Sequence, residues 1–275
     1  MITTRTAGDI VSELKMTRAA FKGVLLVLEG PTDSIFWRNK IAKDQCQITI
    51  SGSKATSVSV TKILDAAGFD GFVVIVDDDY DHFLGSDYDS VNLVATETND
   101  LETLLGSSPA LQKILEEHLV GDHASEHDIE TAELTQKVKT IATVFGKLRY
   151  VNRKHSLNVP FDKLSPWKYV DQQSVELNTH NLCLDFSALC GVSVEQVEVW
   201  LEDAPAEPVW NVIQGHDFTC LLAIALKGRT RTGCNESTIC SSLRLAYEWA
   251  WFKATSLVQR IERWEHGQGR TLLMQ

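Results

Sequence analysis

The sequence is constrained most by ten residues, 24–33, which read VLLVLEGPTD. Five consecutive apolar residues are typical of a strand that is buried on both faces, and Glu29 follows at the point where this strand should end. The Gly-Pro pair then predicts a turn, and Thr32 or Asp33 can cap the helix that follows. The stretch therefore predicts a strand, an acid, a turn and a helix, in that order.

A second stretch repeats this pattern, because the apolar residues 71–76 run directly into the acidic segment 77–81. Alternate residues of an extended chain face the same side, so we expect Asp77 and Asp79 to point the same way. Parallel neighbouring strands would bring both acidic ends to the carboxyl edge of a sheet, where open α/β sheets keep their sites. Three or more carboxylates, Glu29 among them, would then converge and suit Mg²⁺ or Mn²⁺.

Strand and helix patterns alternate along the first part of the chain, which predicts an α/β fold with a parallel sheet flanked by helices. We expect an N-terminal helix over residues 1–21, a sheet domain over 22–120, and a mainly helical domain over 121–275 that packs on it. Within the helical part, residues 121–130 predict a loop, and the pattern from 237 to 264 predicts one long final helix.

Composition limits the class of protein. The 275 residues are 44% hydrophobic, which is enough for a real core, and no apolar run approaches the length of a membrane span. We therefore expect a cytoplasmic protein without a membrane partner. Its six cysteines include no CxxC pair, so we expect them to be reduced. A formal net charge of −11 argues against non-specific coating of nucleic acid, but it is compatible with a nuclease whose acidic site binds cations.

Several basic and polar residues have two interpretations each. Lys54 follows a Gly-Ser pair that lacks the spacing of a nucleotide phosphate loop, yet it could contact a substrate phosphate. His216 either packs and hydrogen-bonds, as a lone histidine usually does, or contacts the scissile phosphate. A basic cluster predicts either a solvated helix face or a contact with nucleic acid, and it consists of Lys137, Lys139, Lys147, Arg149, Arg153 and Lys154.

These motifs carry a resemblance to a known family. The segment Glu29-Gly30-Pro31-Thr32-Asp33 after one strand, with the acidic segment 77–79 after a later one, resembles the Toprim domain of topoisomerases, primases and OLD-family nucleases. The segments 99–102 and 215–217 are similar to OLD-like Toprim nucleases that serve as effectors in bacterial anti-phage systems, among them the PARIS system. The resemblance covers the first 105 residues well and the rest loosely.

The resemblance implies roles for particular residues. Glu29 would be the Toprim glutamate, and Asp77 and Asp79 would be the metal-binding aspartates; all three would be catalytic. Three further acids would be metal ligands, namely Asp33, Asp100 and Glu102. The alternative for the last two is that they are helix N-terminal charges that favour the helix macrodipole.

The resemblance also implies a function. It predicts a metal-dependent endonuclease, a ribonuclease toxic to its own cell, which cleaves host tRNA after release from an AriA-like ATPase during abortive infection. Because one small acidic protomer offers little surface for gripping tRNA, we expect the active form to be a homodimer. Two alternatives are a DNA nuclease or nickase of the OLD type, and a non-catalytic subunit that docks on an ATPase. No tyrosine has a context that marks a nucleophile, which favours hydrolysis over strand passage.

Overall fold

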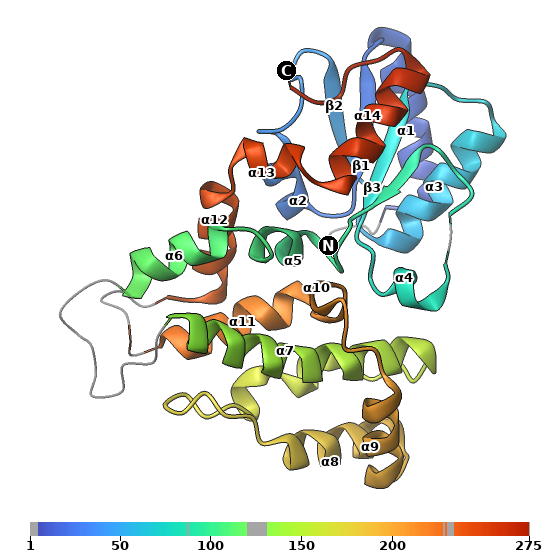
Figure 1. Ribbon diagram of the computed structural model, residues 1–275. Helices are drawn as coiled ribbons and strands as arrows, with labels where there is room; N and C mark the ends of the chain where they lie inside the picture. Colours follow the sequence, from blue (N-terminus) through green and yellow to red (C-terminus); the bar gives the residue numbers. More distant parts are fainter. Residues whose placement is uncertain (1–4, 87, 120–130, 228, 230–233, 275) are drawn as a thin grey trace. The chain divides into compact units, whose positions relative to one another are not determined.

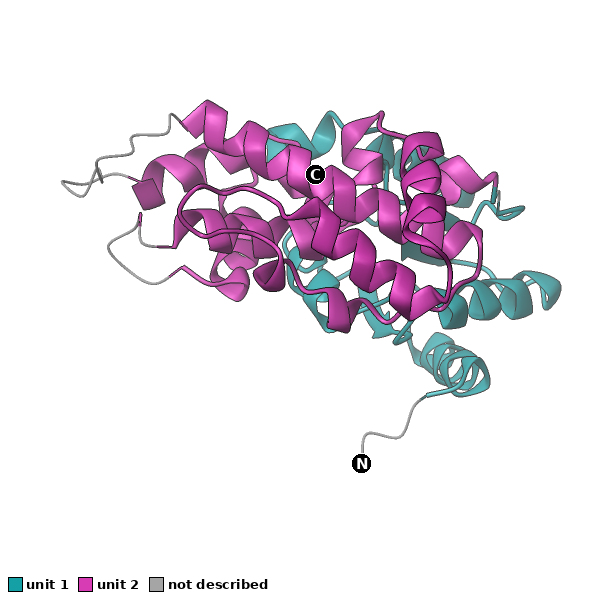
Figure 2. Ribbon diagram, turned by 90° about the horizontal axis from the view of Figure 1, so that it is seen from below, with its two compact units in different colours: residues 1–78, 86–97, 249–275 teal, residues 79–85, 98–248 magenta. Residues whose placement is uncertain are grey.

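The computed structural model describes residues 5–86, 88–119, 131–227, 229 and 234–274. The chain divides into two compact units (Figure 2). The sheet unit consists of Met1–Asp78, Ser86–Glu97 and Trp249–Gln275, and the helical unit consists of Asp79–Gly85 and Thr98–Glu248. These bounds differ from the predicted domains, because the chain leaves the sheet unit inside the acidic segment and returns to it at the end. The predicted loop at 121–130 lies outside the described residues.

The sheet unit is built on four parallel strands in the order β2-β1-β3-β4 (Figure 1). The strands are β1 (Val24–Leu28), β2 (Cys46–Ile50), β3 (Phe72–Val76) and β4 (Leu93–Ala95). The two strands that precede the acids, β1 and β3, are direct neighbours, with Leu28 opposite Ile75 at their carboxyl ends. Every residue of both strands is buried, as their continuous apolar runs predict. The predicted parallel α/β sheet is therefore confirmed.

Helices cover both faces of this sheet. Crossovers between parallel strands are right-handed, and those through α2 (Pro31–Trp37) and α3 (Lys54–Ala66) run in opposite directions across it, so the two helices lie on opposite faces. On one face, β1 packs against α3 and α1 (Ala7–Ala20) in a core that includes Ile10, Leu14, Leu25, Val27, Val60 and Leu64. On the other face, Phe36 and Trp37 of α2 meet Phe252 edge to face.

The end of the chain completes the sheet unit. Residues 237–264 do not form one helix as predicted, because α12 (Glu236–Ala246), α13 (Trp249–Lys253) and α14 (Ser256–Gln268) are separate. Thr255 begins the last of these as its N-cap, and its side chain accepts a hydrogen bond from the Val258 N–H. Helix α14 then runs along β4, where Arg260 Nη2 donates to the Ala95 carbonyl at 2.6 Å.

The helical unit contains the rest of the described helices. These are α4 (Asp81–Leu84), α5 (Leu101–Gly106), α6 (Ala110–Leu119), α7 (Thr131–Lys154), α8 (Thr179–Cys190), α9 (Val194–Asp203), α10 (Val209–Val212), α11 (Gly215–Leu226) and α12, with short 3₁₀ turns at Phe161–Leu164 and Pro166–Lys168. Helix α11 is almost wholly buried and packs along α7. At Gly146 of α7 a Cβ atom would lie 2.0 Å from the Val212 carbonyl oxygen, so only glycine allows the close approach of α10. None of the described helices has the length and apolar character needed to cross a membrane.

Candidate functional site at the carboxyl edge of the sheet

Glu29 lies at the carboxyl end of the central strand β1. Its Oε1 atom accepts a hydrogen bond of 3.0 Å from the backbone N–H of Asp77, the first residue after β3. Both acids are partly exposed, whereas the strands that carry them are buried. Because β1 and β3 are parallel neighbours, two acidic segments that are far apart in sequence meet at one edge, as predicted.

The turn after Glu29 is fixed by a helix cap. Gly30 is the N-cap of α2 and Pro31 is its first residue, a position at which the missing N–H of proline has no cost. Asp33 Oδ2 accepts a hydrogen bond of 2.8 Å from the Gly30 N–H. This bond explains the Gly-Pro-x-Asp spacing in local terms and gives Asp33 a capping role within the sheet unit.

Asp78, the second residue of the acidic segment, is held by contacts with the residue after β4 and with α3. Asp78 is buried, and its N–H donates to Thr96 Oγ1 at 3.0 Å, just beyond β4. The ammonium group of Lys54, the first residue of α3, donates to the Asp78 carbonyl oxygen at 2.7 Å. The structure thus places the Lys54 ammonium at the edge of the sheet that carries Glu29 and Asp77, next to the backbone of the acidic segment.

The donor groups at this edge fit a hard divalent cation. Glu29 and Asp77 offer oxygen ligands only, and Mg²⁺ is commonly bound through one or two carboxylates while water and substrate phosphate complete its shell. The described residues contain no group of three or more His, Cys, Asp or Glu side chains that could hold a metal ion. The expected convergence of three or more carboxylates is therefore not seen in that part of the chain.

Asp79 belongs to the helical unit, and its backbone is not extended. Its φ is 47° and that of Tyr80 is 69°, so both residues adopt the left-handed region. The prediction assumed that the chain stays extended through Asp79, so that Asp77 and Asp79 would face the same side. This assumption is wrong, because β3 ends at Val76. Within the helical unit, Asp79 Oδ2 lies 3.8 Å from Arg153 Nη1.

Asn99 holds this left-handed segment in place. Its carbonyl accepts from the Asp79 N–H at 2.9 Å, and its side-chain Oδ1 accepts from the Tyr80 N–H at 2.9 Å. Its remaining donors bond to the Trp210 carbonyl and to Gln214 Oε1. Asn99 is fully buried and uses both its backbone and its side chain, which gives it a positioning role that the sequence pattern did not reveal.

Asp100 is a buried helix cap. Its Oδ1 accepts from the Thr103 N–H at 2.8 Å as the N-cap of α5, and its Oδ2 accepts from the Gly215 N–H at 2.6 Å. Burial and the nearby Glu102 carboxylate raise the pKa of Asp100 to about 7, against the opposing effect of these two donors. The geometry supports the helix-terminus interpretation of Asp100, with Glu102 in the first turn of the same helix.

The Gly215-His216-Asp217 motif combines three local requirements. A Cβ atom at Gly215 would lie 2.3 Å from Asp100 Oδ1, so glycine alone permits the bond between these segments. His216 is exposed, and its Nδ1 lies 2.5 Å from Glu236 Oε1, a hydrogen bond that raises the pKa of His216. The histidine predicted to bind substrate is therefore already paired with a carboxylate within the helical unit.

Asp217 forms an ion pair that the sequence analysis missed. Arg149 Nε and Nη2 donate to the two Asp217 carboxylate oxygens at 2.6 and 2.8 Å, and the aspartate is buried. One signal was available, because an acid within the otherwise apolar helix α11 must be paired if it is buried. Asp81 is likewise buried and pairs with Arg153.

The basic cluster of α7 is largely occupied within the helical unit. Arg149 and Arg153 pair with the aspartates just described, and Lys147 Nζ donates to the Leu201 carbonyl at 2.8 Å. Lys139 lies over the Trp210 ring, with its ammonium 4.8 Å from the ring centroid. The cluster is therefore not a uniformly solvated helix face, and several of its charged groups already have partners within the protein rather than being set out to bind phosphates.

The fold and this edge define the chain as an α/β protein with a four-stranded parallel sheet whose carboxyl edge carries Glu29, Asp77 and Lys54. Comparison of the sequence with protein-family models and with curated proteins finds no match in either. The narrower assignment of a family and an activity is accordingly a matter of proposal.

Proposed function

We propose that the chain is a metal-dependent endonuclease of the Toprim type, whose catalytic edge includes Glu29 and Asp77. The observation that carries this proposal is the 3.0 Å hydrogen bond between Glu29 Oε1 and the Asp77 N–H, at the carboxyl ends of adjacent parallel strands. Both acids are partly exposed, so both remain accessible enough to meet a substrate. The resemblance of both motifs to Toprim proteins supports the same interpretation.

The chemistry follows from the groups at this edge. The Asp77 N–H orients the Glu29 carboxylate, which can accept a proton from the attacking water or help to hold a cation. Lys54 supplies a fixed positive charge that favours the approach of a phosphate. A divalent cation held by Glu29 and Asp77 would neutralise negative charge on the phosphate during hydrolysis. The resemblance also assigns metal binding to Asp79, which is two residues after Asp77 in sequence.

The resemblance favours RNA as the substrate and a cellular role as a toxic effector of anti-phage defence. We propose that host tRNA is cleaved after release from an AriA-like ATPase, and that the released form is a homodimer. The net charge of −11 and the pairing of Arg149 and Arg153 with aspartates support dimerisation, since a second protomer would enlarge the surface that contacts tRNA.

The test compares cleavage by the purified wild-type protein and by Glu29→Gln, with total tRNA and with plasmid DNA as substrates, in Mg²⁺ or Mn²⁺. The expected result is wild-type cleavage of tRNA that Glu29→Gln abolishes. Glu262→Gln is the matched control, because it makes the same charge change at an exposed position of α14 and should leave cleavage intact. Cleavage of plasmid alone would favour a DNA nuclease or nickase.

Growth after induced expression separates the enzymatic role from a docking role. If the chain is a nuclease effector, expression of the wild type should stop growth and expression of Asp77→Ala should be tolerated. Undiminished toxicity of Asp77→Ala, together with no cleavage of either nucleic acid by the wild type, would contradict the proposal and favour a non-catalytic subunit that docks on an ATPase.

A further inference from the structure

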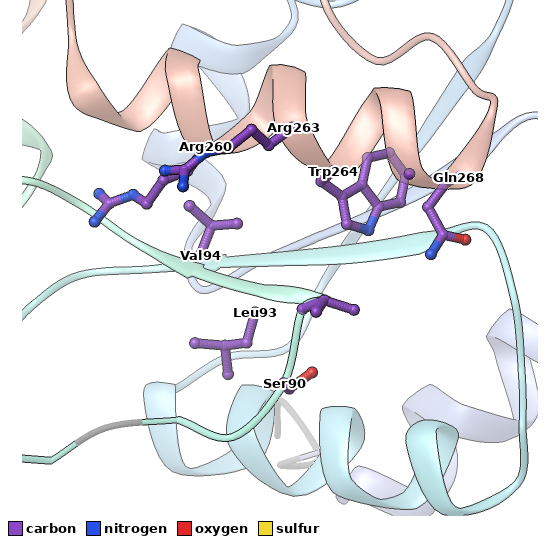
Figure 3. Close-up of a pocket in the computed structure, with 9 residues that line it drawn as sticks. Ser90, Leu93, Val94, Arg260, Arg263, Trp264 and Gln268 are labelled. Carbon is purple, nitrogen blue, oxygen red and sulfur yellow. The ribbon is translucent and has the colours of Figure 1, made fainter.

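A pocket of about 490 Å³ lies along the edge strand of the sheet unit (Figure 3). Helix α14 forms one wall, and β4 with the residues before it forms the other. The volume falls within the range of small-molecule sites, roughly 300–1,000 Å³. The lining residues are Ser90, Val91, Leu93, Val94, Arg260, Arg263, Trp264, Gly267 and Gln268.

The lining combines an apolar floor with positive charge. Val94 and the Trp264 ring supply the apolar surface between β4 and α14, whereas the Leu93 side chain lies on the other side of β4 (Figure 3). The Trp264 N–H is fixed by a hydrogen bond of 2.9 Å to Asn92 Oδ1. Arg260 and Arg263 are the charged residues of the lining, which includes no acid, although the whole chain has a net charge of −11. A pocket with this charge in an acidic protein favours an anionic ligand.

Arg260 is already partly desolvated. Its Nη2 donates to the Ala95 carbonyl at 2.6 Å, while its buried Nε has no hydrogen-bond partner among the described residues. Burial lowers the pKa of Arg260 and the nearby Arg263 lowers it further, whereas the Glu97 and Asp78 carboxylates offset part of this effect, so the charge of Arg260 is held at a cost. An anion in the pocket would offset that cost, because a guanidinium bonds well to phosphate oxygens.

The end of the pocket away from the two arginines suits a flat ring that carries polar groups. Gln268 offers an amide group at this end, and the lining also includes the Ser90 hydroxyl and Val91, which is 76% exposed. In Figure 3 the two arginines lie toward one end of α14 and Gln268 toward the other, with Trp264 between them. An apolar ring on the floor and a phosphate at the arginines would satisfy both ends at once.

We infer that this pocket binds a nucleoside phosphate, taken either as a free nucleotide or as one nucleotide of a bound RNA. The pocket is distinct from the acidic edge, but a short series of contacts connects the two within the sheet unit. Arg260 bonds to Ala95, and the next residue, Thr96, accepts the hydrogen bond of the Asp78 N–H. A nucleotide in the pocket would therefore lie beside the strand end that supports the acidic segment.

The test measures binding of the four 5′-ribonucleoside monophosphates and of a short RNA oligonucleotide by calorimetry. The RNA experiments use the Glu29→Gln background so that the oligonucleotide stays intact. Arg263→Glu should weaken binding at least about tenfold, the effect expected from losing one charge-assisted hydrogen bond. Arg38→Glu is the matched control, because it reverses the charge of an exposed arginine of the same unit outside the pocket.

A second variant fills the pocket without changing its charge. A Cβ atom at Gly267 would meet no atom within 4 Å, so Gly267→Phe can place its ring at the mouth of the pocket. Phenylalanine is also a better helix former than glycine, so the thermal midpoint should not fall. Binding should be lost in Gly267→Phe while the folded state is retained.

The outcomes distinguish the sources of the ligand. Mononucleotide binding that both pocket variants weaken indicates a free nucleotide, and RNA binding alone with the same sensitivity indicates a part of the substrate. The inference is overturned if no probe binds or if both pocket variants bind the probes as the wild type does. Loss of cleavage in Glu29→Gln is scored separately, so failure of the nuclease proposal does not decide this one.

Discussion

The acids of the two units differ in what surrounds them. At the sheet edge, Glu29 and Asp77 are partly exposed, and the bond between them joins a carboxylate to a backbone N–H. In the helical unit, Asp81, Asp100 and Asp217 are buried, and each is paired with an arginine or with helix N–H groups. The difference teaches that an acid just beyond a strand end can stay partly exposed, whereas the acids inside the helical packing are buried and satisfied by arginine or backbone donors.

The largest expected effect tests the sheet edge. Asp77→Asn should lower the rate of tRNA cleavage by at least about 100-fold, because the carboxylate that would hold the cation is lost. The thermal midpoint should stay close to that of the wild type, because the acid is partly exposed. Asp44→Asn makes the same change at an exposed position and should cleave normally. A variant as active as the wild type would remove Asp77 from the site.

The next effect tests the helical unit. Asp217→Ala leaves the Arg149 guanidinium without its buried partner and should lower the free energy of unfolding by about 3–5 kcal/mol. Asp162→Ala removes an exposed aspartate of the same unit and should cost no more than about 0.5 kcal/mol. Urea titrations of both variants measure the difference. Equal midpoints would show that the buried pair does not stabilise the fold.

A pH experiment tests whether the buried Asp100 makes the stability of the fold depend on pH. Its pKa of about 7 in the folded state lies above the ordinary value of 3.8, so the folded state binds the proton more tightly. The resulting stability is complete below pH 3.8 and is lost as the pH rises toward 7, with a slope of up to about 1.4 kcal/mol per pH unit. Glu102→Gln removes a charge that raises this pKa and should make the loss smaller. Identical profiles in urea titrations between pH 4 and 8 would contradict this account.

The smallest effect concerns an acid of the sheet unit that resembles those of the helical unit. Asp33→Ala should cost about 1 kcal/mol of stability through the lost cap of α2, and cleavage should continue at close to the wild-type rate. Thr32→Ala, at the exposed neighbouring position, is the control for the local change in helix propensity. If Asp33→Ala abolishes cleavage at unchanged stability, Asp33 is a ligand after all, and the division between the two kinds of acid fails.

Local signals explain what could be predicted from the sequence. The apolar runs of β1 and β3 and the acids at their ends are contiguous in sequence, so the sheet and the meeting of Glu29 with Asp77 were accessible. The left-handed backbone at Asp79 could not be predicted from the sequence, because it depends on hydrogen bonds to Asn99. The pairing of Arg149 with Asp217 likewise depends on the packing of α7 against α11, which periodicity alone does not specify.

The sheet unit is discontinuous in sequence, and this affects how the protein can be made. Its first strands emerge early in synthesis, but Phe252, which packs on α2, and Arg260, which bonds to β4, leave the ribosome only after the helical unit has been made. Since domains generally fold as units during translation, the sheet can reach its final packing only after residues 249–275 have been made. A nascent chain, or a fragment that stops at residue 120, would therefore lack the helices that finish the sheet, and so would be harmless if the activity is toxic.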